Sequence, residues 1–249
     1  LKLCMSLVHE FEKSGNWLFR RRSWLPVFIA IPGFLILYLT DHQTITFKWE
    51  IEIIFLAISI FGQIIRVLTV GFAPGNTSGR NTTSGQIADE LNVTGIYSIV
   101  RHPLYTGNFF MWLGPVLFIR SAWFVVVFIL AYWLYYERIM FAEEQFLRRK
   151  FGEAYDKWAE KVNAVIPSFR NYMPPRLSFS LKTVIRREYN SFINIFLTFL
   201  ALDIARNYFI SGKFLITPMW GWLFLSAGII WLFTRIIHKK TSWLFVEGR

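Results

Sequence analysis

Few charged residues and a single cysteine separate this sequence from those of most soluble and disulfide-rich proteins. Charged residues make up only 17% of its 249 residues, whereas a soluble globular domain usually carries about 25%. The lone Cys4 excludes an intrachain disulfide. The sequence also lacks a histidine pair at metal-ligand spacing, a phosphate-binding glycine loop and a Gly-x-Gly-x-x-Gly motif. We therefore expect no metal site and no Rossmann-type nucleotide-binding domain.

Long apolar runs account for the scarcity of charge. Hydrophobic residues make up 54% of the sequence, and six runs approach or reach the roughly 20 residues that cross a bilayer as a helix. They cover about residues 24–40, 50–72, 104–119, 122–141, 192–210 and 218–237. The sequence thus predicts an all-α, polytopic transmembrane helical bundle of about six spans. The N-terminal region has no apolar core followed by small residues, so no cleavable signal peptide is expected.

Basic residues alternate between rich and poor connections. Five Lys or Arg residues precede the first run, whereas only Lys48 lies between the first two runs. Eleven lie between residues 138 and 187, whereas the turn near residue 121 contains only Arg120. Because Lys and Arg collect on the cytoplasmic side, this alternation predicts that both termini are cytoplasmic. The topology explains the net charge of +11 without a nucleic-acid partner, and the sequence leaves the oligomeric state open.

Charged residues within the apolar runs include Arg66, Asp203 and Arg206. Asp203 and Arg206 lie three residues apart on one helix face, so we expect them to pair and to reduce the cost of placing charge in the bilayer. Arg66 lies in the cytoplasmic half of the second run. We interpret it as an arginine that snorkels to the interface, with a role in a site as the alternative.

A first motif, GIYSIVRHPLYTG at residues 95–107, lies where a predicted cytoplasmic loop enters the third run. Pro103 is placed to begin a helix, since proline lacks the N–H that the first turn does not need. The free backbone N–H groups of such a turn favour a carboxylate or another anion. Taken alone, the motif is explained equally well as a basic, aromatic membrane anchor.

A second motif, EEQFLRRKFGEAYDKW at residues 143–158, follows the fourth run. Gly152 is placed to end a helix. The next stretch, with Tyr155 and Trp158 on one face, predicts an amphipathic helix lying on the membrane surface. The adjacent Glu143 and Glu144 could form a solvated helix face paired with nearby arginines. Alternatively, they could accept hydrogen bonds from ribose hydroxyls or balance a cationic ligand.

Together, the two motifs resemble those of the isoprenylcysteine carboxyl methyltransferase family and its phospholipid methyltransferase relatives. The shared patterns are Arg-His-Pro-x-Tyr-x-Gly from residue 101 and Glu-Glu-x-x-Leu-x-x-x-Phe-Gly-x-x-Tyr from residue 143. The resemblance implies an S-adenosylmethionine-dependent membrane methyltransferase with its core and cofactor site at residues 91–167. Residues 1–90 would contribute two transmembrane helices and a cytoplasmic loop. Residues 168–249 would add a cytoplasmic segment and a transmembrane hairpin that lie outside the resemblance.

The resemblance also implies roles for individual residues. The cofactor-binding residues would be Leu91, Tyr97, His102, Pro103, Leu104, Tyr105, Glu143 and Glu144. Arg101 and Arg138 are the candidate catalytic residues. Arg138 is near the position of a substrate-facing arginine in the family, although it lies five residues before Glu143 where the family pattern predicts four.

The acceptor is predicted from the chemistry that the motifs lack. Nothing resembles a strong general base, which favours an anionic oxygen that is already deprotonated. A lipid phosphate is the first candidate, with a prenylcysteine carboxylate and a phospholipid amine as alternatives. A membrane NADPH-dependent reductase of the sterol or fatty-chain type stays open, although Leu104 and Asn108 depart from its motif, as does a non-catalytic membrane protein. The lack of targeting signals favours a bacterial inner membrane, with the site facing the cytoplasm.

Overall fold

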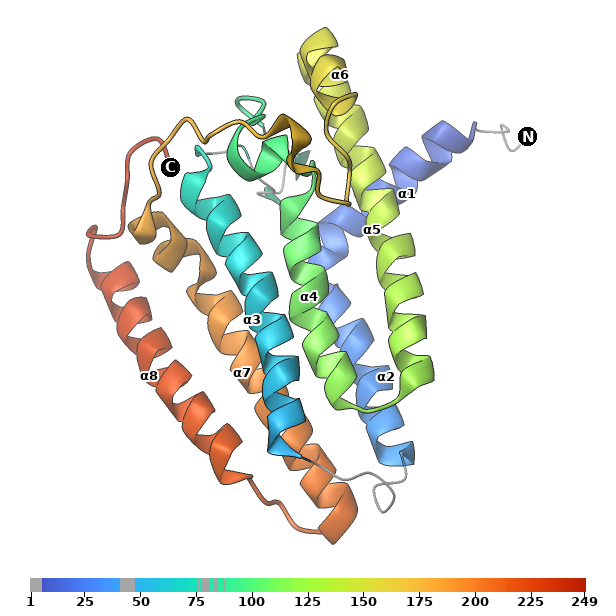
Figure 1. Cartoon of the computed structure of the whole chain (residues 1–249), viewed down its shortest axis with the longest axis vertical. Coiled ribbons are helices and arrows are strands. Elements are labelled where there is room, and N and C mark those ends of the chain that lie inside the picture. The colour runs from blue at the N-terminus through green and yellow to red at the C-terminus, as the bar shows by residue number, and fades with distance from the viewer. Residues whose placement is uncertain (1–5, 41–47, 76, 78–80, 83–84, 87) are drawn as a thin grey trace.

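The structure, a computed structural model, describes residues 6–40, 48–75, 77, 81–82, 85–86 and 88–249 and is a bundle of helices (Figure 1). Its α-helices are α1 (Leu7–Arg21), α2 (Leu25–Leu39), α3 (Trp49–Phe72), α4 (Pro103–Phe118), α5 (Ala122–Phe151), α6 (Glu153–Ala159), α7 (Leu181–Ser211) and α8 (Pro218–Lys240). Its 3-10 turns are η1 (Arg22–Trp24), η2 (Gly95–Ser98) and η3 (Phe169–Asn171), and two short strands, β1 (Asn81–Thr82) and β2 (Gly85–Gln86), pair with each other. The helical-bundle prediction is confirmed, because each predicted apolar run forms a helix.

The long apolar helices make the chain an integral membrane protein. Within the described residues, α3, α5, α7 and α8 are long and apolar enough to cross a bilayer, and α1 with α2 would add a fifth span if this pair, bent by 58°, crosses as one. With 16 residues, α4 is shorter than the roughly 20 that a crossing needs. The count of six therefore stays a prediction. In Figure 1, α6 and the C-terminus lie at the same end of the bundle as α1.

α3 and α4 approach each other closely through small residues. A Cβ atom on Gly62 would lie 2.4 Å from the carbonyl oxygen of Gly107, and one on Gly114 would lie 2.2 Å from Ser59 Oγ. Glycine is therefore required at these positions, as is common where membrane helices touch. The contact fixes the beginning of α4, and with it the first motif, against the middle of α3.

A buried ionic cluster (Glu52, Asp203 and Arg206) joins α3 and α7 at the other end of the bundle. Arg206 donates to Asp203 at 2.6 Å, which confirms the expected pair, and also to Glu52. Glu52 accepts a further hydrogen bond from Trp220 Nε1 of α8 at 2.9 Å. The three charged residues are at most 4% exposed. They thus face the protein interior, where ionisable residues of membrane proteins are usually found.

The short helix α6 packs against protein at the opposite end. Tyr155 and Trp158 are 1% and 9% exposed and form a small core with Tyr97 and Val162. Gly152, at φ +53°, ends α5 as predicted. The prediction that the apolar face of this helix lies on the membrane is wrong, because the loop before α4 covers that face.

Candidate functional site

The first motif forms a loop at residues 95–102, here called the site loop, which continues into α4 at Pro103. The segment after α6 pairs with it through the backbone. The N–H groups of Arg101 and His102 donate to the carbonyl oxygens of Asn163 and Ala164, at 2.9 and 3.2 Å. A further backbone bond runs from that segment back to the loop at 3.0 Å. These bonds fix the backbone of the site loop, including that of His102, at the end of the bundle.

Glu143 and Glu144 of α5 meet the site loop. Glu144 Oε1 accepts a hydrogen bond from Arg101 Nε at 2.9 Å and lies 2.9 Å from His102 Nε2. Glu143 Oε2 accepts from the Tyr105 hydroxyl at 2.9 Å and lies 3.7 Å from His102 Nδ1. Both ring nitrogens of His102 therefore face a carboxylate. The glutamate side chains are only 21% and 24% exposed, so the pair packs against the site loop and is not a solvated helix face.

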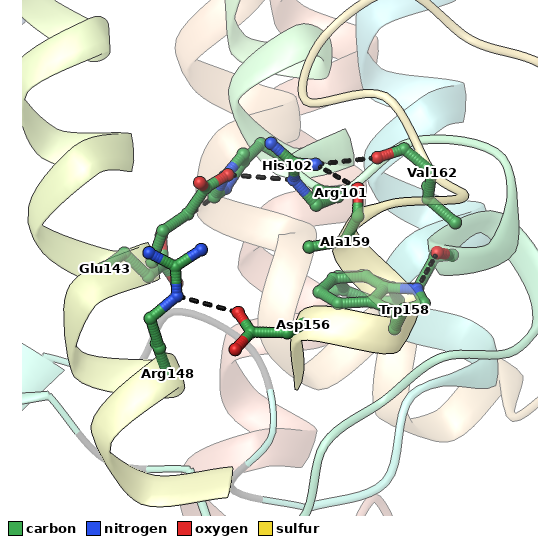
Figure 2. Close-up of polar contacts among 10 residues, drawn as sticks. Arg101, His102, Glu143, Arg148, Asp156, Trp158, Ala159 and Val162 are labelled. Carbon is green, nitrogen blue, oxygen red and sulfur yellow. Dashed lines mark hydrogen bonds and ion pairs between the residues drawn. The ribbon is translucent and has the colours of Figure 1, made fainter. Parts of the chain in front are cut away.

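Arg101 connects the site loop to α6, as Figure 2 shows. Its Nη1 donates to the carbonyl oxygens of Ala159 and Val162, at 2.7 and 2.8 Å. These carbonyls lie at the C-terminal end of α6, where intrahelical partners run out. Nearby, Trp158 Nε1 donates to the carbonyl oxygen of Tyr97 at 3.1 Å (Figure 2). Together with its bond to the α5 carboxylate, these contacts make Arg101 the junction of the loop, α5 and α6.

The site loop, α5 and α6 border a cavity of about 580 Å³, a volume typical of small-molecule sites. Nine of the predicted site residues line it: Leu91, Tyr97, Arg101, His102, Pro103, Leu104, Tyr105, Glu143 and Glu144. Arg138 is not among the described residues that line this cavity. Its guanidinium lies over the ring of Phe11 on α1, 3.4 Å from the ring centroid. The structure thus brings the predicted residues together with the exception of Arg138.

The cavity also has walls that the sequence analysis did not identify. Arg66 lines it and forms an ion pair with Glu188 of α7 at 2.8 Å, so the snorkelling interpretation is wrong. Asn108 and Ser191 line it too. Asn108 lies three residues after Tyr105 on the same face of α4, so helical periodicity could have predicted it as a cavity residue. Nothing in the spacing could link Arg66 with Glu188, which are 122 residues apart.

One buried hydroxyl at the cavity, that of Tyr155, lies close to the Glu144 carboxylate but makes no hydrogen bond of good geometry with any described residue. Tyr155 lines the cavity. Burial, and next the negative charge of Glu144, raises the pKa of Tyr155 well above its ordinary value, so the hydroxyl keeps its proton and can donate. An unsatisfied buried polar group costs about 1–3 kcal/mol. A ligand with an acceptor atom at this point would remove that cost.

Comparison with known proteins shows which family the site-bearing segment resembles. Residues 52–154 match the sequence model of the phospholipid methyltransferase family. The family resemblance is confirmed. The segment that matches the phospholipid methyltransferase family contains the site loop and both glutamates. It also contains most of α3 and all of α4, which pack together through glycine. α7 and α8 lie outside it.

Curated relatives show the same similarity. The chain is 31% identical over 125 residues to a probable protein-S-isoprenylcysteine O-methyltransferase of Oryza sativa, covering 48% of this chain and 62% of the relative. It is 34% identical over 108 residues to the protein-S-isoprenylcysteine O-methyltransferase of Schizosaccharomyces pombe, covering 43% and 45%. The chain thus spans less than two thirds of the length of these methyltransferases. No solved structure matches it.

A bacterial relative carries a different name. The chain is 30% identical over 142 residues to a nickel-cobalt-cadmium resistance protein of Alcaligenes xylosoxydans, covering 56% of this chain and 62% of the relative. In the part of this chain that the structure describes, no group of three or more His, Cys, Asp or Glu residues is arranged to hold a metal ion. The likeness to that protein therefore identifies no metal site here.

Proposed function

We propose that this protein is an S-adenosylmethionine-dependent methyltransferase that acts on a membrane-embedded, lipid-like acceptor at an anionic oxygen. The observation that carries the proposal is the cavity at the end of the apolar helices, where His102, Glu143 and Glu144 of the family segment converge. A water-soluble cofactor could enter from the aqueous side, whereas the acceptor could approach from the bilayer. A site at the mouth of a helical bundle is accessible to both.

The cavity residues fit this cofactor. Glu143 and Glu144 can accept hydrogen bonds from ribose hydroxyls or balance a cationic ligand, and the hydroxyl of Tyr155 offers a donor. His102, Pro103, Leu104 and Tyr105 would hold the amino-acid end, as the resemblance implies. When bound, S-adenosylmethionine would supply the methyl group, and the electron pair of its carbon–sulfur bond would stay on sulfur as the acceptor oxygen bonds to the carbon. The rate of such a displacement depends chiefly on how the two reactants are positioned. The backbone hydrogen bonds between the site loop and the segment after α6 would keep the binding residues in position.

The preferred acceptor is a lipid phosphate, followed by a prenylcysteine carboxylate, because either is ionised at neutral pH and needs no general base. A phospholipid amine is the third candidate. No observation favours the NADPH-dependent reductase. We further propose a bacterial inner membrane as the location. The charge alternation of the sequence supports an orientation with the cavity on the cytoplasmic side.

Binding of S-adenosylmethionine to the detergent-purified chain, measured by calorimetry, tests the cofactor assignment. The wild-type protein is expected to bind, and Glu143→Ala to bind at least about tenfold more weakly, since hydrogen bonds to charged groups are the stronger ones. Glu153→Ala is the matched control, because Glu153 is 81% exposed and its one ion pair among the described residues is with Lys157. Absence of binding by a folded wild-type sample would remove the proposal. If binding is found, transfer of labelled methyl groups to a native lipid extract identifies the acceptor.

Tyr155→Phe is expected to weaken cofactor binding without lowering the thermal stability of the protein. Losing a neutral donor should weaken S-adenosylmethionine binding by about two- to tenfold, which corresponds to one ordinary hydrogen bond. Removing a hydroxyl that makes no hydrogen bond of good geometry with the described residues should leave the thermal stability of the free protein unchanged or slightly raised. The two quantities are measured by calorimetry and by thermal unfolding. Unchanged affinity would show that the hydroxyl does not meet the cofactor.

A further inference from the structure

The cavity continues beyond the predicted cofactor residues, toward the interior of the bundle. Its additional walls come from several elements and include Phe19, Arg22, Arg66, Asn108, Tyr136 and Ser191. On α4, Asn108 lies three residues after Tyr105, which moves the wall about 4.5 Å deeper along the helix. This part of the cavity, here called the inner compartment, therefore lies on the bilayer side of the cofactor residues.

Arg66 is held in the inner compartment by a fixed set of partners. Its Nε and Nη2 donate to the two carboxylate oxygens of Glu188, each at 2.8 Å, in a bidentate pair. Its Nη1 donates to Asn108 Oδ1 at 2.6 Å. A guanidinium has five N–H groups, so these three bonds leave two without an acceptor among the described residues. Gln63 Nε2 also donates to Glu188, at 3.1 Å, which fixes the carboxylate in turn.

The ion pair is asymmetric toward the cavity. The Arg66 side chain is 18% exposed, whereas the Glu188 side chain is 5% exposed. A pair that served only to join α3 to α7 would not need its cationic member at a ligand cavity. Here the guanidinium of Arg66 lines the cavity and keeps two N–H groups without an acceptor among the described residues, whereas the carboxylate of Glu188 lies farther from the cavity.

Glycine at position 107 makes room for this arrangement. A Cβ atom on Gly107 would lie 2.7 Å from Arg66 Cγ, so any other residue would displace the arginine side chain. Gly107 is the last residue of the first motif and lies within residues 52–154, the segment that matches the family model. Glu188 is on α7, which lies outside that segment. The position of Arg66 thus depends on both parts of the chain.

We propose that Arg66 binds the anionic oxygen of the acceptor through its two remaining N–H groups, and that Glu188 is the positioning residue that aims it. The proposal rests on the methyltransferase function proposed above and names its acceptor as an anion. Arg66 thereby takes the substrate-side role that the sequence suggested for Arg138. A guanidinium suits this role because its planar donors match phosphate and carboxylate groups.

The test compares two probes with the same chain, farnesyl phosphate and farnesol, by measuring their binding to the detergent-purified full chain. The wild-type protein is expected to prefer the phosphate by about tenfold or more. Arg66→Gln should lose most of this preference. Arg66→Lys should also lose much of the preference for the phosphate, since an ammonium keeps the positive charge but not the planar, bidentate donors of a guanidinium. Arg235→Gln, a change to an arginine that lies over Trp231 on α8, should keep it.

A double variant controls for loss of binding that is caused by misfolding. Arg66→Gln alone leaves Glu188 buried without its cation, whereas Arg66→Gln combined with Glu188→Gln keeps a neutral pair that can form hydrogen bonds. S-adenosylmethionine affinity, measured on the same samples, should be unchanged in every variant. No preference for the phosphate in the wild-type protein, or a preference that survives in the double variant, would overturn the assignment of Arg66. Loss of S-adenosylmethionine binding by the wild-type protein would instead overturn the proposed function.

Discussion

Arg206→Ala is expected to lower the free energy of unfolding by about 3–5 kcal/mol, because removing one partner of a buried ion pair leaves uncompensated charge. Arg206 donates to both Glu52 and Asp203, and these carboxylates are 3% and 0% exposed. Without the guanidinium, two carboxylates would share a buried site that holds no cation. Thermal and denaturant unfolding of the detergent-solubilised protein, followed by tryptophan fluorescence, measures the loss.

Arg235→Ala is the matched control for stability. Arg235 also lies on a membrane helix over an aromatic ring, 4.8 Å from its centroid, but it has no place in the buried ionic cluster. Its loss should change the free energy of unfolding by no more than about 0.5 kcal/mol, as is usual at such positions. Equal effects of the two substitutions would mean that the cluster contributes nothing specific to stability.

Glu144→Ala is expected to reduce the rate of methyl transfer by about a hundredfold or more. Its carboxylate accepts from Arg101 and meets His102, and Arg101 in turn holds the end of α6. Removing it releases the site loop and α6 together, and displacements of about 1 Å cost rate factors of this size. Initial rates of labelled methyl transfer to native lipid extract provide the measurement.

Glu153→Ala separates this effect from a general change of charge. Glu153 lies at the beginning of α6, is 81% exposed and pairs with Lys157 in the same helix. It should retain the wild-type rate. A rate for Glu144→Ala within about twofold of wild type would show that the site loop keeps its geometry without this carboxylate, and transition-state positioning would then have to come from other contacts.

The helices and the site loop could be predicted from the sequence because their signals are local. Apolar runs give the helices, and the adjacent glutamates and the Arg-His-Pro stretch give the residues that meet at the cavity. The Asp203–Arg206 pair also follows from a spacing of three residues on one helix. The helices and the ion pair need only the periodicity of a single element, whereas the site residues were predicted from the resemblance of the two motifs to those of a family.

The partners that join distant helices could not be predicted in this way. Glu52 meets Arg206 across 154 residues of sequence, and Arg66 meets Glu188 across 122. Periodicity shows which face of a helix is polar but not which helix lies opposite. The close contact of α3 and α4 depends on glycines that appear in the sequence without any hydrophobic pattern. The covering of α6 by the site loop was missed for the same reason.

The buried ionic cluster also constrains the biogenesis of the protein. Arg206 is synthesised 154 residues after Glu52, so α3 reaches the bilayer before its counter-ion exists. Until then, we expect the Glu52 carboxylate to stay near the headgroups, because an ionised group in hydrocarbon is costly. Asp203 and Arg206 emerge only three residues apart and can enter as a locally neutral unit. Insertion of the final hairpin therefore completes the charge balance of a helix that was translated long before it.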